Sequence, residues 1–148
     1  MNRRDVFFAY LLVGVAIFAS LNSRAADERR GDWTIHHSDE PGKLDFALIE
    51  HRHGGTSDHE SSWPLSVFVG LDVSKPGRHD VKFVVTRDAG RFECDGFLEN
   101  GDGTGFFRFI ADAGYRRAME VLGFNGIDDD KQYQMAAMDV SQAFAKEM

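Results

Sequence analysis

The sequence predicts an α+β protein, with a mostly antiparallel β-meander of five or six strands followed by two or three short C-terminal helices. Up to about residue 112, apolar side chains recur at every second position, as they do in strands that bury one face. After Asp112 the apolar residues recur at helical spacing instead. The connections between the expected strands are too short to hold a crossover helix, so neighbouring strands are expected to run antiparallel.

The first 25 residues have the three-part build of a secretory signal peptide. Arg3 and Arg4 give a positive start, residues 6–21 carry no charge, and the small residues Ser23 and Ala25 precede an expected cleavage after Ala25. The uncharged run is shorter than the roughly 20 residues that a membrane span needs. We therefore expect an exported protein, periplasmic or secreted, without a membrane span after cleavage. An anchor formed by an uncleaved N-terminal helix is the minor alternative.

Residues 26–112 are expected to form an antiparallel β domain. Leu44, Phe46 and Leu48 fall on one face of one expected strand, and Phe92 and Cys94 share a face of another. The expected strands cover residues 31–39, 43–52, 64–71, 79–88, 91–100 and 106–112, the first with the weakest pattern.

Polar and glycine-rich stretches separate these strands. Residues 53–62, HGGTSDHESS, are expected to form a loop. Gly90 is expected to close a tight hairpin, because glycine tolerates a positive φ. Gly101 to Gly105 are expected to turn the chain into the next strand rather than to cradle a ligand. No phosphate-loop lysine follows them, and Ala111 stands where a calcium loop needs its bidentate acid.

Residues 113–148 are expected to form a helical segment that packs on the β domain or extends from it. Gly123 is expected to end the first helix in the left-handed conformation. Asp128 is expected to cap the start of the second helix, and Ser141 that of the third. The apolar stripe of the second helix is expected to consist of Tyr133, Ala136, Ala137 and Val140.

The composition excludes one class of partner. The net charge is −7 at pH 7, and cleavage of the arginine-rich start makes the remainder more acidic. Such a surface repels phosphates, and no basic patch or RNA-binding motif offsets it, so no nucleic-acid partner is expected. No cofactor is expected either. The expected partner is an envelope protein or a second copy of the chain.

Six histidines give the sequence one candidate metal site. His51 and His53 lie two positions apart on an expected strand, so their rings are expected to project from the same face. With His59 or His79 as a third ligand, they could hold zinc or copper. The alternative is a polar outer face of an edge strand beside a loop.

No complete catalytic motif is present. HESSW, at His59, lacks the second histidine of the zinc-peptidase helix, and no serine sits in a nucleophile elbow. Cys94 is expected to be a small core residue, with a functional or intermolecular thiol as the alternative. Trp63 and Phe144 are the candidate interaction residues. Trp33 could also be an exposed anchor, and partial burial is an equal alternative for both tryptophans.

Three stretches, RDAGRFECDGFLENGDGTGFFRF, YRRAMEVLGF and QMAAMDVSQAFAKEM, carry a resemblance to a known pattern. They resemble exported bacterial proteins of unknown function that combine R-D-A-G-x-F, G-x-G-x-F-x-F and a V-S/T-x-x-F helix start. The helical end is similar to short repeats found behind the metallopeptidase domain of antirepressor-type, drug-sensing membrane receptors. The resemblance covers about Pro64 to Met148.

This sequence departs from those receptors, because it holds about one helical repeat unit and lacks the peptidase motif and the membrane helices. The resemblance therefore implies a sensory or scaffold accessory module, and it carries over no catalytic residues. Together with the absence of a complete catalytic motif, it favours a non-enzymatic binding or protein-interaction module of the bacterial envelope. A histidine-based metal-binding protein or small metalloenzyme is the alternative.

Overall fold

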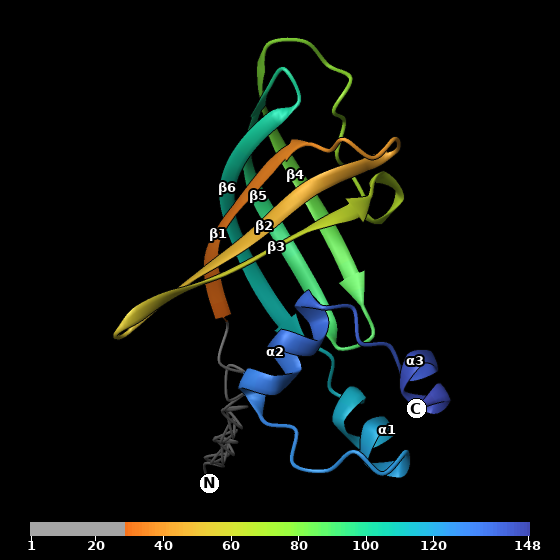
Figure 1. Ribbon diagram of the computed structural model, residues 1–148. Helices are drawn as coiled ribbons and strands as arrows, with labels where there is room; N and C mark the ends of the chain where they lie inside the picture. Colours follow the sequence, from red (N-terminus) through yellow and green to blue (C-terminus); the bar gives the residue numbers. More distant parts are fainter. Residues whose placement is uncertain (1–28) are drawn as a thin grey trace, which may run out of the picture.

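The computed structural model describes residues 29–148, and the expected signal peptide lies outside the described residues. Six strands come first along the chain and three helices follow, which confirms the α+β class (Figure 1). The strands are β1 (Arg29–His37), β2 (Lys43–Arg52), β3 (Gly55–Pro64), β4 (Arg78–Arg87), β5 (Gly90–Glu99) and β6 (Asp102–Ala111). The helices are α1 (Tyr115–Val121), α2 (Asp129–Ala137) and α3 (Gln142–Glu147), and a short 3-10 helix, η1 (Leu65–Val67), follows β3.

All six strands belong to one antiparallel sheet with the order β3-β2-β1-β6-β5-β4. The sheet thus consists of two three-stranded meanders that are joined by the pairing of β1 with β6. It is strongly curled, and β2 and β3 cross in front of β4 and β5 in Figure 1. The two ends of the sheet therefore face each other across a shared interior.

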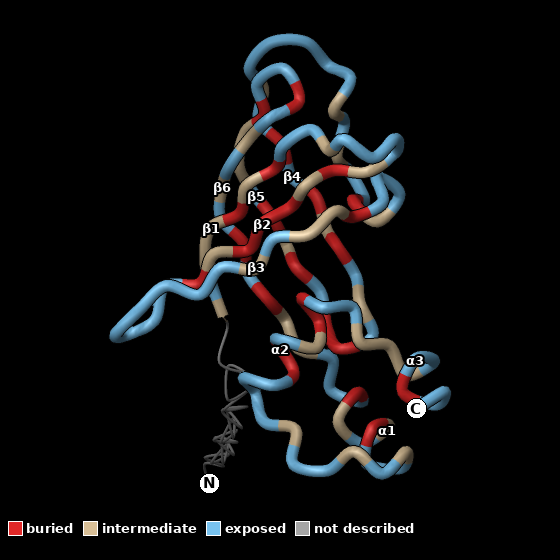
Figure 2. The backbone as a smooth tube through the Cα atoms, in the orientation of Figure 1, coloured by how far each residue is buried: buried red, intermediate tan, exposed pale blue. Residues whose placement is uncertain are grey.

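Aromatic side chains fill this interior. The ring centroids of Phe46 on β2 and Phe83 on β4 lie 6.2 Å apart, and those of Trp63 on β3 and Phe92 on β5 lie 6.4 Å apart. These contacts join strands that are not neighbours in the sheet, so burial of the rings holds the curl together. The buried positions alternate along the strands, as Figure 2 shows, because every second side chain points inward.

Residues 53–71 differ from the expectation. The expected loop over 53–62 is wrong, because only His53 and Gly54 form the turn and β3 begins at Gly55, pairing with β2 along its whole length. The strand expected over 64–71 is also wrong, because the chain forms η1 there and turns Phe68 into the core. Backbone pairing with β2 stabilises a polar edge strand that periodicity alone does not reveal.

Residues 101–105 were expected to form a turn, but most of the glycines in this stretch lie where strand β6 closely approaches its neighbours. The two-residue turn consists of Asn100 and Gly101, with φ angles of 54° and 89°, as a type I′ hairpin requires. Gly105 lies within β6 and pairs with Gly96 of β5. There the indole Nε1 of Trp33 donates hydrogen bonds to the carbonyls of Asp95, at 3.2 Å, and Phe106, at 3.1 Å. Gly96 leaves room for the indole, and Gly103 and Gly105 lie where a Cβ atom would clash with the neighbouring strand β5.

The helix ends follow the sequence expectations. The side chain of Asp128 accepts a hydrogen bond from the N–H of Lys131, and that of Ser141 accepts one from Phe144. Gly123, with φ 94°, follows α1 in the left-handed conformation. Of the stripe expected on α2, Tyr133, Ala136 and Ala137 are buried, while Val140 lies beyond the helix end and is half-buried.

The helical segment packs on one end of the sheet through α2. The Tyr133 ring contacts Phe92, Phe107 and Phe109. Beside it, the buried amide of Gln132 donates to the carbonyls of Ala89 and Asp112. None of the helices in residues 29–148 has the length and apolar character that a membrane span requires.

Candidate functional site

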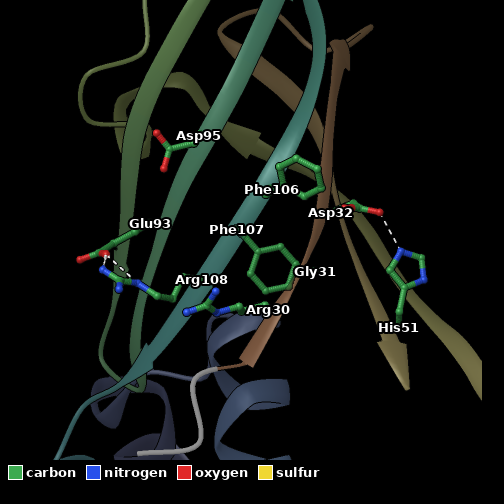
Figure 3. A pocket seen from close by; sticks show the side chains of 9 residues that line it. All are labelled: Arg30, Gly31, Asp32, His51, Glu93, Asp95, Phe106, Phe107 and Arg108. Carbon is green, nitrogen blue, oxygen red and sulfur yellow. Dashed lines mark hydrogen bonds and ion pairs between the residues drawn. The ribbon is translucent and has the colours of Figure 1, made fainter. Parts of the chain in front are cut away.

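A shallow pocket of about 670 Å³ lies on the outer face of the sheet, across β2, β1, β6 and β5 (Figure 3). Most of its side chains come from the strand positions that point away from the aromatic core. They are Arg30, Gly31, Asp32, His51, Glu93, Asp95, Phe106, Phe107 and Arg108.

Phe106 is the exposed aromatic residue of this pocket. Its neighbour Phe107 points into the core and is 2% exposed, and strand alternation therefore turns Phe106 outward, where it is 73% exposed. In the strand register, Phe106 pairs with Asp32 on β1 and with Asp95 on β5. An apolar ring thus lies between two carboxylates on the water-facing side of the sheet.

Two pairs of charged or polar side chains lie around Phe106 in this pocket. His51 Nε2 lies 2.7 Å from Asp32 Oδ2, and Arg108 Nε donates to Glu93 at 3.1 Å (Figure 3). Arg91 Nε also donates to Glu93, at 3.1 Å. The hydrogen bonds from Arg108 and, less strongly, from Arg91 lower the pKa of Glu93 against the opposing effect of burial. Glu93 is therefore held by two arginines, and Asp32 lies within hydrogen-bond distance of His51.

The lining of this pocket combines an exposed aromatic ring with charged side chains. Its lining includes the Asp32–His51 pair but no serine, threonine or cysteine to serve as a nucleophile. The nearest thiol, that of Cys94, lies on the inner face, and burial raises its pKa, with Asp95 and Glu93 adding to the rise. An exposed aromatic ring surrounded by arginines and polar groups is instead the composition found at protein interfaces.

The structure does not bring the three candidate metal ligands together. His51 points outward and pairs with Asp32, His53 lies in the β2–β3 turn, and His59 lines a different cavity on the inner side. The alternative third ligand, His79, lies beside the carbonyls of Gly77 and Asp72. Within residues 29–148, no three His, Cys, Asp or Glu side chains are grouped to hold a metal ion. The metal site stays a prediction from the sequence.

The two candidate interaction residues lie in different environments. Trp63 is 5% exposed and packs on Phe46, 5.0 Å away between ring centroids, so the expectation of a surface anchor at this position is corrected. Side chains alternate between the two faces of β3, and this alternation points the Trp63 indole inward, where the curled sheet covers it. Phe144 on α3 is 53% exposed, and Met148 nearby in the chain is 80% exposed.

Phe106 and Arg87 were not among the candidate residues predicted from the sequence. The doublet Phe106–Phe107 held a usable signal, because two adjacent apolar residues in an alternating strand must face opposite sides. Arg87 continues the inward series Val81, Phe83 and Val85, and this places a cation at a core-facing position. Which outward residues surround Phe106 depends on the β1–β6 pairing, and no sequence pattern reveals that pairing.

The chain matches no protein-family model, no curated protein and no solved structure.

Proposed function

We propose that the protein is a non-enzymatic binding module of the bacterial envelope, and that it recognises an envelope protein or a second copy of itself through the outer face around Phe106. The observation that carries this proposal is the 73% exposure of Phe106 in a pocket where Asp32 is paired with His51 and Arg108 with Glu93. Burial of an aromatic ring in a partner is a large source of binding free energy at interfaces.

The charge pattern supports a protein partner. Carboxylates flank Phe106 on both neighbouring strands, while Arg108 and Arg91 lie on the side of Glu93. A surface with both signs of charge around an apolar centre suits a partner surface with complementary charges, which sets orientation and association rate. The export of the chain is part of the proposal and rests on the sequence of its first 25 residues.

Site-specific photo-crosslinking in intact cells tests the binding surface. A photo-reactive phenylalanine analogue at position 106 is expected to give one discrete adduct, identified by mass spectrometry as an envelope protein or as the chain itself. The same analogue at Arg117, an exposed position on α1 that does not line the pocket, is the control and is expected to give none. Equal crosslinking at both positions, or none at 106, contradicts the proposal.

Localisation is tested separately. Cell fractionation is expected to place the protein in the envelope or the medium, and intact mass is expected to show a chain that begins after Ala25. A full-length chain in the cytoplasm contradicts the export part of the proposal. The binding surface is then still tested by the crosslinking experiment.

A further inference from the structure

A second cavity, of about 430 Å³, lies on the inner side of the sheet, where β3 ends and the junction between α2 and α3 passes by. It is lined by His59, Ser61 and Trp63 of β3, by Arg87 at the end of β4, and by Met138 and Asp139 of the junction. These residues face the opposite way from Phe106, so this cavity is separate from the proposed interaction surface.

Arg87 is a buried cation with an unused donor. Its side chain is 10% exposed, and its guanidinium lies over the Trp63 ring, 4.3 Å from the ring centroid. The Nε atom is buried and has no hydrogen-bond partner among the described residues. Burial lowers the pKa of Arg87, and the charge of Asp139 opposes that shift. A buried guanidinium with an unsatisfied donor costs free energy unless something else bonds to it.

The one carboxylate paired with Arg87 in the structure is exposed. Asp139 Oδ2 lies 3.1 Å from Arg87 Nη1, and the Asp139 side chain is 56% exposed. Asp139 is held by the turn that ends α2, in which its N–H bonds to Ala136 and the N–H of Val140 bonds to Met135. An ion pair with one solvent-exposed partner is weak, so another carboxylate can take the place of Asp139.

We propose that this cavity binds a small ligand that combines a carboxylate with a short apolar group, and that the ligand's carboxylate replaces Asp139 on Arg87. The planar fork of an arginine matches a carboxylate with two parallel hydrogen bonds, and so gives Nε a partner. Trp63, Val67 and Met138 offer apolar walls for the rest of the ligand. The volume lies within the range of about 300–1,000 Å³ that is usual for small-molecule sites.

Ser61 fits the same ligand. Its hydroxyl oxygen accepts a hydrogen bond from Trp63 Nε1, which leaves the hydroxyl hydrogen for another acceptor. The lining that holds Arg87 therefore also holds a neutral hydrogen-bond donor.

Isothermal titration calorimetry of the purified protein tests the proposal with 3-phenylpropanoate as the probe. We expect it to bind with a Kd below about 1 mM, and we expect 3-phenylpropan-1-ol, which lacks the carboxylate, to bind at least about tenfold more weakly. Inorganic phosphate is expected to compete poorly, because it lacks the apolar group. Equal binding of the acid and the alcohol, or displacement of the acid by millimolar phosphate alone, overturns the proposed ligand chemistry.

Three variants locate the site. Arg87→Gln is expected to weaken the binding of 3-phenylpropanoate about tenfold or more, while Arg117→Gln, which changes an exposed arginine on α1, leaves it unchanged. Asp139→Asn removes the competing carboxylate but keeps a residue that tolerates the positive φ, so it is expected to bind the probe several-fold more tightly. If Arg87→Gln does not fold, the Asp139→Asn variant still tests the proposal. Unchanged or weaker binding of the probe by this variant overturns the displacement of Asp139. No binding of the probe by the parent protein or by Asp139→Asn overturns the ligand site.

Discussion

Gly96 lies directly against the indole of Trp33: a Cβ atom at position 96 would lie 2.6 Å from Cζ2 of Trp33 and 2.3 Å from the carbonyl oxygen of Thr104. Gly96→Ala is therefore expected to lower the free energy of unfolding by about 1–3 kcal/mol or more, because neither the backbone nor the buried ring can move away cheaply. Urea denaturation followed by tryptophan fluorescence measures the change.

The control for this prediction is Gly55→Ala. A Cβ at Gly55 meets no atom within 4 Å, and Gly55 is not among the positive-φ residues. We expect its effect to stay within about 0.5 kcal/mol. Equal destabilisation by the two variants would contradict the close packing of Gly96 on Trp33.

The buried amide of Gln132 joins α2 to the sheet. Its Nε2 donates to the carbonyls of Ala89 and Asp112, and its Oε1 accepts from Arg116 Nε at 2.6 Å. Gln132→Leu is expected to lower the free energy of unfolding by about 1–3 kcal/mol, because it leaves the Asp112 carbonyl without this donor. Exposed Gln134→Leu on the same helix is the control, and hydrogen exchange is expected to show faster opening of α2 only in the Gln132 variant.

The thiol of Cys94 is expected to be inert in the folded protein. It is 2% exposed, and burial raises its pKa, so the reactive thiolate is scarce near neutral pH. Labelling with a water-soluble disulfide reagent is expected to be slow in native buffer and complete in denaturant. Fast stoichiometric labelling of the native protein would instead favour the functional thiol considered from the sequence.

Glu93 is expected to make stability depend on pH. Its pKa is lowered below the ordinary value of 4.5, so its contribution is fully present above that pH and is lost as the pH falls through the lowered value. Glu93→Gln is expected to lower the free energy of unfolding by about 0.2–1 kcal/mol near neutral pH. The difference from the parent protein is expected to vanish in strong acid.

Local patterns predicted much of this fold. Leu44, Phe46 and Leu48 mark β2 through alternation, and Asp128 and Ser141 mark helix starts because capping depends on neighbouring residues alone. Long-range contacts explain what the patterns did not predict. β3 is polar because it lies at the sheet edge, and only pairing with β2 identifies it as a strand.

The candidate sites were harder to predict from the sequence than the strands and helices, because the sites are formed by long-range contacts. Phe106 becomes the centre of a pocket only because β1 and β5 flank β6, and Arg87 meets Trp63 only because the sheet curls. His51 and His59 are close in sequence, but strand alternation on either side of the His53–Gly54 turn sends them to different faces. The resemblance to exported bacterial proteins stays a prediction.

The pairing of β1 with β6 also sets the order in which a newly made chain can mature. Trp33 and Phe106 are 73 residues apart, so at about 5–20 residues per second the ribosome delivers the second about 4–15 s after the first. During that interval the indole of Trp33 lacks the Phe106 carbonyl, and the edge of β1 that pairs with β6 is free. The nascent chain therefore passes through a stage in which one edge of β1 is unpaired before the sheet closes.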